Sequence, residues 1–226
     1  YPCIPGIDFG ESCSAGGDMM ITGAFNAVQD CLIRDAEPSV RLRCYSMQPW
    51  FDEYPFTMLK KEQYAEQSPV FHPEGSVWEH TVRVVDEAAK RKTYSSDITA
   101  FMWAALLHDI GKPETTRIRK GKITAYDHDS TGAELSRRFL AEFTVDNVFI
   151  ERVALLVKYH MQALYVKKSL PFADIRGMVE NGIVEDVALL SFCDRLGRAN
   201  ADPPREREAV RALLKACGMD PDLAWL

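Results

Sequence analysis

The stretch Ala-Leu-Leu-His-Asp-Ile-Gly-Lys-Pro, residues 105–113, decides how the chain folds. Asp97 is placed to cap a helix that runs through the apolar residues before this stretch. The glycine and the proline at its end favour termination of that helix, because proline cannot continue it. His108 and Asp109 therefore lie at the last turn of a predicted helix with a strongly apolar surface, and a polar pair at such a position indicates a functional or structural role.

Outward from this helix, apolar residues recur with helical spacing over most of the chain. Ser76 and Glu79 form a capping box, which predicts a helix starting near Val77. Further helices are predicted over residues 129–143, 148–159, 171–180, 183–196 and 206–216. Residues 116–118 and 123–125 flank a turn at Gly121 and predict a short β-hairpin. The expected fold class is an all-α bundle with one small hairpin.

The first 67 residues have a different character and are predicted to form an appendage that packs on a main domain of residues 68–226. Residues 1–18 are rich in glycine, serine, proline and cysteine and are predicted to be irregular. Helices are predicted over residues 19–34 and 50–63, with prolines breaking the region into short pieces.

Composition narrows the function classes. The 226 residues are 46% hydrophobic and 27% charged, as in an ordinary globular protein, and no apolar stretch reaches the roughly 18 residues of a membrane-spanning helix. We expect no secretory signal and no membrane partner. The six cysteines form no CxxC pair, which favours a reducing, cytoplasmic location. A net charge of −6 argues against a protein that coats long nucleic acid, and the basic run at residues 117–122 is either a solvated turn or a local anion contact.

Four polar residues share the inward face of predicted helices, each three or four residues from an apolar residue: His80, His108, His160 and Asp194. Burial of an unpaired carboxylate is costly, so Asp194 needs a compensating charge. A divalent metal held by several such residues would supply it. Taken singly, each histidine could instead be a satisfied core residue, and Asp194 could pair with Arg152 or Arg176.

Taken together, these residues resemble the signature of the HD superfamily of metal-dependent phosphohydrolases: His80, then His108-Asp109 followed by Ile-Gly-Lys, then Asp194 in Phe-Cys-Asp-Arg. The resemblance covers about residues 68–200. In the stretches HPEGSVWEHT, ALLHDIGKP, YDHDSTGAEL and LLVKYH it is strongest to the HD domains of bacterial CCA-adding tRNA nucleotidyltransferases and to related stand-alone HD hydrolases. The implied fold is the HD-domain helical bundle.

The resemblance implies a set of metal ligands. His80, His108, Asp109 and Asp194 would bind one divalent ion, and Asp109 would bridge to a second. The second ion would be held by His128 and His160, and we expect two ions. Nitrogen-rich ligation favours Mn, Fe, Co, Ni or Zn, with Mg in a looser site.

Three further residues are implied to contact substrate. Lys112 would bind a phosphate oxygen beside the metals and act in catalysis with Asp109, although a lysine there also suits a helix C-terminus. His72 would contact substrate or supply an acid at the pocket rim. Arg198, with Arg195 beside it, would steer an anionic substrate, unless both form surface salt bridges.

The expected activity is hydrolysis of a phosphomonoester or 2′,3′-cyclic phosphodiester of a nucleotide or RNA end. Residues 1–70 lack a Gly-Ser pair followed by an Asp-x-Asp motif, so no nucleotidyltransferase activity is expected. The rival hypothesis is a non-catalytic, metal-binding HD module that senses a nucleotide or positions RNA. A purely structural helical bundle is the third alternative.

Overall fold

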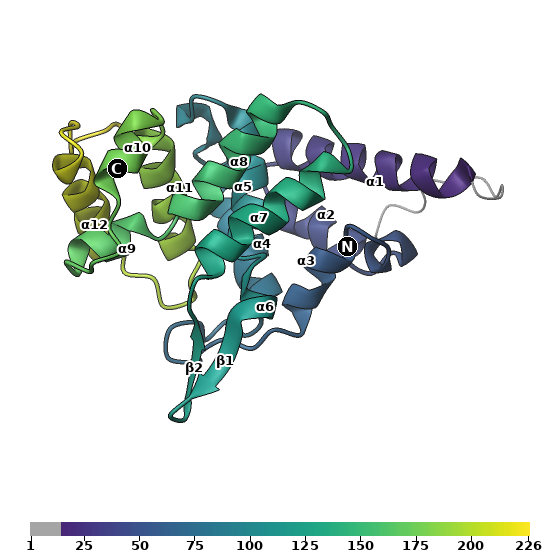
Figure 1. The fold of residues 1–226 in the computed structure, drawn as a ribbon, viewed down its shortest axis with the longest axis horizontal. Coiled ribbons are helices and arrows are strands. Elements are labelled where there is room, and N and C mark those ends of the chain that lie inside the picture. Colours follow the sequence, from purple (N-terminus) through teal and green to yellow (C-terminus); the bar gives the residue numbers. More distant parts are fainter. Residues whose placement is uncertain (1–14) are drawn as a thin grey trace.

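The structure, a computed structural model, describes residues 15–226 and is all-α with one two-stranded hairpin, as predicted (Figure 1). Five helices form the main bundle: α4 (Val77–Ala89), α5 (Ile98–Leu107), α7 (His128–Ala141), α8 (Asn147–Tyr159) and α11 (Val184–Leu196). The central helix is α5, which packs against α1, α4, α8 and α11. Every residue from Ala100 to Ile110 is buried, and as far as Leu107 the sequence offers no polar face in this stretch. The predicted caps at Ser76 and Asp97 are both made, but only the serine half of the predicted capping box forms, since the Glu79 carboxylate accepts from Arg43 at 2.9 Å.

The N-terminal elements pack onto α4 and α5. They are α1 (Ala15–Arg34), α2 (Pro38–Tyr45), η1 (Pro49–Asp52), α3 (Thr57–Lys60) and η2 (Lys61–Gln63). The helix predicted over residues 50–63 is wrong, because Pro55 splits this stretch into two 3₁₀ turns and a single α turn. Residues 1–18 were predicted to form an irregular arm. Residues 1–14 lie outside the described residues, and residues 15–18 belong to α1, so the prediction is wrong for these four residues.

Aromatic side chains join these elements to the bundle. The Phe56 ring lies 5.4 Å from that of Phe139 in α7, and the Phe25 ring stacks at 4.7 Å on that of Trp103 in α5. The Lys92 ammonium in η3 (Lys92–Tyr94) donates to the Ile33 carbonyl at 2.6 Å, near the C-terminus of α1. Residues on both sides therefore contribute to one apolar core.

The hairpin links two helices whose first residues belong to the candidate site. β1 (Thr116–Arg119) pairs antiparallel with β2 (Lys122–Ala125), and a two-residue turn of Lys120 and Gly121, both at positive φ, joins them. The single turn α6 (Lys112–Thr115) precedes the hairpin, and α7 follows it. α7 begins at His128, one residue earlier than predicted.

The C-terminal elements are α9 (Gln162–Lys167), α10 (Ile175–Glu180) and α12 (Pro203–Ala216), with α12 packed on α9 and α11. The prediction of a helix from residue 171 is wrong at its start, since Asp174 caps α10 through the Gly177 amide. α12 begins before its predicted start because Asp202 caps it and proline fits the first helical turn. None of the helices in residues 15–226 is both long and apolar enough to cross a bilayer.

Candidate metal centre

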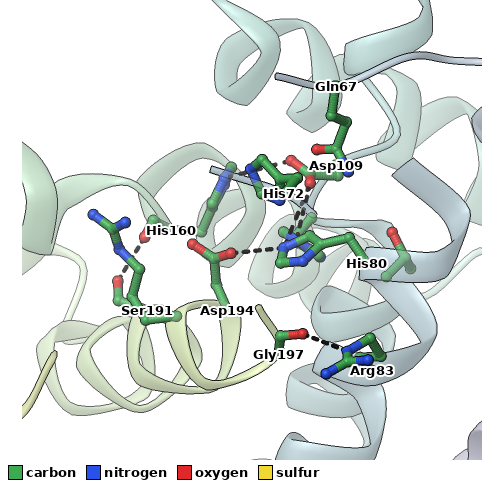
Figure 2. Close-up of polar contacts among 12 residues, drawn as sticks. Gln67, His72, His80, Arg83, Asp109, His160, Ser191, Asp194 and Gly197 are labelled. Atoms are coloured by element: carbon green, nitrogen blue, oxygen red, sulfur yellow. Dashed lines mark hydrogen bonds and ion pairs between the residues drawn. The ribbon is translucent and has the colours of Figure 1, made fainter. Parts of the chain in front are cut away.

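Six buried side chains from five helices or their ends converge at one site, and Figure 2 labels four of them, His80, Asp109, His160 and Asp194. They are His80 from α4, His108 and Asp109 after α5, His128 at the start of α7, His160 after α8, and Asp194 from α11. α4, α8 and α11 pack against α5, and α7 packs against α8, so residues far apart in sequence meet here. All six residues expected to bind metal are therefore brought together.

Asp109 lies between the histidines, and its two oxygens face different groups. Oδ2 is 3.2 Å from His108 Nε2 and 4.0 Å from His80 Nε2. Oδ1 is 3.5 Å from His128 Nε2 and 3.9 Å from His160 Nε2. We call the first group, which includes Asp194, the Oδ2 side, and the second the Oδ1 side. One carboxylate thus joins two sets of donors.

Backbone carbonyls fix the orientation of three histidines. Each Nδ1 lies 2.7–2.9 Å from the carbonyl three residues earlier: His108 on Ala105, His128 on Ala125 and His160 on Val157. A carbonyl only accepts hydrogen bonds, so each Nδ1 carries the proton and donates it. In a neutral ring, Nε2 is then an acceptor directed at Asp109.

The ring of His80 is oriented by a carboxylate instead of a backbone carbonyl. Its Nδ1 lies 2.9 Å from Glu74 Oε1, and its Nε2 lies 2.9 Å from Asp194 Oδ1. Glu74 also binds His72 Nδ1 at 3.0 Å. Second partners of this kind orient the ring of a metal-binding histidine and fix its tautomer.

The donor set fits divalent metal. Nε2 of His128 and Nε2 of His160 face each other at 3.3 Å, although both are acceptors when the rings are neutral. Among the described residues, the buried Nε2 of His108 makes no hydrogen bond. Two ligands of one ion at ~2.0–2.2 Å are at most about 4.4 Å apart, and the distances from Asp109 given above satisfy this limit. The groups His80–His108–Asp109 and Asp109–His128–His160 could each hold an ion.

Charges differ between the two sides. Burial lowers the pKa of His108, but the charge of Asp109 outweighs it and raises this pKa to about 9. On the other side, burial and the nearby His128 lower the pKa of His160 to about 4. Burial also lowers the pKa of His128. At neutral pH without metal, His108 on the Oδ2 side is therefore protonated beside Asp109, and the two imidazoles of the Oδ1 side are neutral.

Asp194 is compensated within the site. Burial raises its pKa, but the hydrogen bond from His80 and the charge of Arg198 together hold this pKa well below its usual range. The alternative ion pairs are wrong: Arg152 binds Asp186, and Arg176 binds Glu180.

A cavity of about 240 Å³ opens onto four residues of the centre, Asp109, His128, His160 and Asp194, and the three expected substrate residues also line it: Lys112, His72 and Arg198. Lys112 Nζ lies 2.6 Å from Asp109 Oδ2 and 2.6 Å from Gln67 Oε1. His72 has a pKa lowered to about 4, chiefly by burial, so its ring is neutral at pH 7. A neutral ring disfavours the acid role considered for His72. Arg195 pairs with Glu206 at 3.7 Å, as the salt-bridge alternative predicted, whereas Arg198 has no ion pair among the described residues.

Sequence reasoning missed Glu62, Gln67 and Glu74. Glu74 orients two histidines, Gln67 holds Lys112, and Glu62 is fully buried behind the centre with its Oε2 bonded to Thr81 at 2.9 Å. The only available signal for Glu74 was its place between His72 and His80, since polar loop residues are common without such a role.

The chain matches the HD domain family over residues 77–199, more than half of its length. It is 36% identical over 90 residues, 39% of the chain, to an A-adding tRNA nucleotidyltransferase of Deinococcus radiodurans. It is 34% identical over 113 residues, 49% of the chain, to a CC-adding tRNA nucleotidyltransferase of Thermus thermophilus. These matches cover 20% and 24% of the two enzymes, so the chain spans only about a quarter or less of each relative.

Proposed function

The chain belongs to the HD domain family, and from this premise we propose that it is a phosphohydrolase that uses two divalent metal ions. Its substrate would be a phosphomonoester or a 2′,3′-cyclic phosphodiester of a nucleotide or RNA end. The observation that carries the proposal is the position of Asp109, whose two oxygens face separate sets of histidine donors.

The ligands divide accordingly. His80, His108 and Asp194 would hold one ion, His128 and His160 the other, and Asp109 would contact both. Bound ions would supply Lewis acidity, which lowers the pKa of water and stabilises charge on a phosphoryl group. The nitrogen-rich donor set favours Mn, Fe, Co, Ni or Zn over Mg.

Lys112 would stabilise negative charge on the phosphoryl oxygens. An ammonium has three donors, and two of them are directed at Asp109 and Gln67. The third is available to a phosphate in the cavity. Because Gln67 is itself held by Ser76 through Nε2 at 3.1 Å, its carbonyl oxygen is oriented toward Lys112.

His72 would accept a hydrogen bond from substrate rather than donate a proton. Its Nδ1 is bound to the Glu74 carboxylate, which leaves Nε2 as an acceptor. A sugar hydroxyl is a suitable donor. Arg198 would add positive charge at the same cavity.

The nucleotide or RNA character of the substrate rests on the relatives, whose names describe nucleotide addition to tRNA. We assign the activity to the cytoplasm, where RNA ends and nucleotides occur. The cysteines Cys31 and Cys193, both buried and free, agree with a reducing compartment.

A second candidate function is a metal-binding module that positions RNA without hydrolysing it. It is favoured by one observation: the matched part is a minor share of enzymes whose named activity is nucleotide addition. In that case the same metal ligands would stabilise the fold.

The test is a metal-reconstitution assay. Protein stripped with a chelator would be loaded with Mn²⁺, Co²⁺, Ni²⁺, Zn²⁺ or Mg²⁺ and assayed with an aryl phosphate, nucleoside 2′- and 3′-phosphates and 2′,3′-cyclic nucleotides. We expect metal-dependent release of phosphate or ring opening with at least one of them. Stoichiometric metal binding without turnover of any substrate would favour the positioning module.

A further inference from the structure

Four cationic side chains line the cavity above the candidate metal centre: Lys112, Lys168, Arg195 and Arg198. Two are neutralised within the protein, since Lys112 contacts Asp109 and Arg195 contacts Glu206. The other two, Lys168 and Arg198, have no ion-pair partner among residues 15–226. Apart from the two carboxylates of the metal centre, Glu66 is the acidic residue in the cavity lining. The cavity lining therefore holds two cationic side chains beyond Lys112 that form no ion pair with a described residue, although the charge of Arg198 also acts on Asp194.

Lys168 differs from the lysine directly before it. Lys167 donates to the Arg205 carbonyl at 2.9 Å and lies 4.0 Å from Glu208, so it is engaged with α12. Lys168 lies at the C-terminal end of α9 and lines the cavity instead. A lysine that only complements a helix terminus has no need to line a cavity. The two adjacent lysines thus have different environments on one short helix.

Arg198 is a half-buried guanidinium in the cavity wall. Its Nε is buried and makes no hydrogen bond to any described residue. Its charge acts on both Asp194 and His72, so the guanidinium lies close to the Oδ2 side of the centre. The guanidinium lines the cavity, where its planar set of donors is suited to an anion.

The rest of the cavity wall is suited to a nucleoside. Phe71, Ile123, Met161 and Leu164 contribute apolar side chains, and the Phe71 ring is exposed. Exposed aromatic rings beside cationic groups can stack with bases while the cations bind phosphates. The cavity lining thus combines apolar side chains, which suit a base, with the cations Lys112, Lys168 and Arg198, which suit phosphates.

We propose that Lys168 and Arg198 form a second anion subsite, which holds a phosphate other than the one hydrolysed at the metal centre. This inference rests on the proposed phosphohydrolase function and narrows its substrate to one with at least two phosphates. Two sources share this chemistry: a mononucleotide with a second phosphate on its ribose, and the next phosphodiester of an RNA 3′ end. A substrate with a single phosphate leaves the subsite empty.

The experiment compares substrates with one and two phosphates. We would measure kcat/KM for adenosine 3′-phosphate, adenosine 3′,5′-bisphosphate and a dinucleotide with a 3′-phosphate, and express the last two relative to the first. In the double variant Lys168→Gln/Arg198→Gln we expect this ratio to fall about tenfold or more, mainly through KM, because two charge-assisted contacts are lost. The matched variant Lys167→Gln/Arg176→Gln removes two cations outside the cavity lining and should keep the wild-type ratio. Arg198→Lys, which keeps the charge, should restore part of the ratio when combined with wild-type Lys168.

The outcomes distinguish a mononucleotide from an RNA end as the substrate, and they test the anion subsite separately from the phosphohydrolase function. A ratio that falls for the dinucleotide alone identifies an RNA end, and one that falls for the bisphosphate identifies a mononucleotide. A ratio unchanged for both substrates in Lys168→Gln/Arg198→Gln overturns the subsite. If no substrate is hydrolysed, calorimetric titration with adenosine 3′,5′-bisphosphate tests the subsite alone: it requires weaker binding in the double variant than in the matched variant, and equal binding would overturn it.

Discussion

The Oδ2 side of Asp109 combines two histidines with a second carboxylate, whereas the Oδ1 side consists of two histidines facing each other. On the Oδ2 side, His80 Nε2 contacts Asp194 at 2.9 Å and His108, whose pKa is raised, lies beside Asp109, so both carboxylates already have partners within the protein. On the Oδ1 side, the two Nε2 atoms are 3.3 Å apart, and Oδ1 of Asp109 lies 3.5 Å from the Nε2 of His128. The groups of the Oδ2 side can be stabilised by one another, whereas the two facing acceptor nitrogens of the Oδ1 side would be stabilised by a bound cation.

This difference predicts unequal affinities. An ion on the Oδ2 side would gain two carboxylates, but it must displace the contact between His80 and Asp194. An ion on the Oδ1 side would meet neutral imidazoles with free lone pairs and a single shared carboxylate oxygen. More anionic ligands give stronger attraction for a divalent cation, so we expect the Oδ1 ion to be the weaker one.

The largest effect is expected from removing the residue that joins the two sides. His108→Ala/Asp109→Ala should lower the metal content from about two ions per chain to none and reduce phosphatase or cyclic phosphodiesterase activity to background. Metal analysis and turnover would be measured on the same preparation. Glu208→Gln, on the exposed face of α12, serves as the control. Hydrolysis at the wild-type rate in the double variant would contradict the assignment of Asp109.

A second variant separates the sides. His160→Ala should lower the metal content from about two ions to about one and reduce turnover by about 100-fold, because one of two Lewis acids is lost. His128→Ala should behave in the same way. Unchanged stoichiometry and rate in His160→Ala would instead assign both histidines to substrate contacts and leave a one-metal mechanism.

Removing the charge of Lys112 should strengthen metal binding and weaken catalysis. Lys112 contacts Asp109 at 2.6 Å and so competes with a cation for that carboxylate. Lys112→Met keeps the length of the side chain and removes the charge. We expect tighter metal binding together with a roughly 10- to 100-fold lower kcat/KM, since a contact to the phosphoryl group is lost. A parallel loss of metal and turnover would show that Lys112 supports the fold of the site instead.

The smallest effect concerns Glu62, behind the centre. Burial raises its pKa to about 8, so the folded metal-free protein keeps a proton on Glu62 that the unfolded chain releases above its ordinary pKa. Folded protein then binds more protons than unfolded protein, and the free energy of unfolding should fall as the pH rises from about 4.5 to about 8. Glu62→Gln should remove this part of the pH dependence and raise Tm at pH 8, with each kcal/mol worth about 2–4 °C. Identical slopes of Tm against pH in both proteins would contradict it.

Much of the fold follows from local sequence patterns. The caps at Ser76 and Asp97, the apolar run of α5 and the glycine in the hairpin turn act over a few residues, so their consequences were predicted. The helix expected over residues 50–63 failed at Pro55, although the sequence showed this proline as a break, because the apolar spacing was followed across it. The short helix α9 was missed because its six residues carry too little periodicity.

The candidate site was predictable to the extent that its residues share an inward helical phase. That phase placed His80, His108, His160 and Asp194 on buried faces, and the packing of four helices brings them together. Gln67 and Glu74 come from a loop, where no period marks direction. Their contacts with Lys112 and His80 depend on how that loop crosses the end of the bundle, which only the tertiary structure shows.

The most direct test of the account is the number and position of metal ions in the wild-type protein. Crystals grown with Mn²⁺ would be examined by anomalous diffraction, and metal content would be measured at saturation in solution. We expect two ions per chain, one beside His80, His108 and Asp194 and the other beside His128 and His160, with Asp109 in contact with both. A single ion at saturation, or ions that Asp109 does not contact, would contradict it.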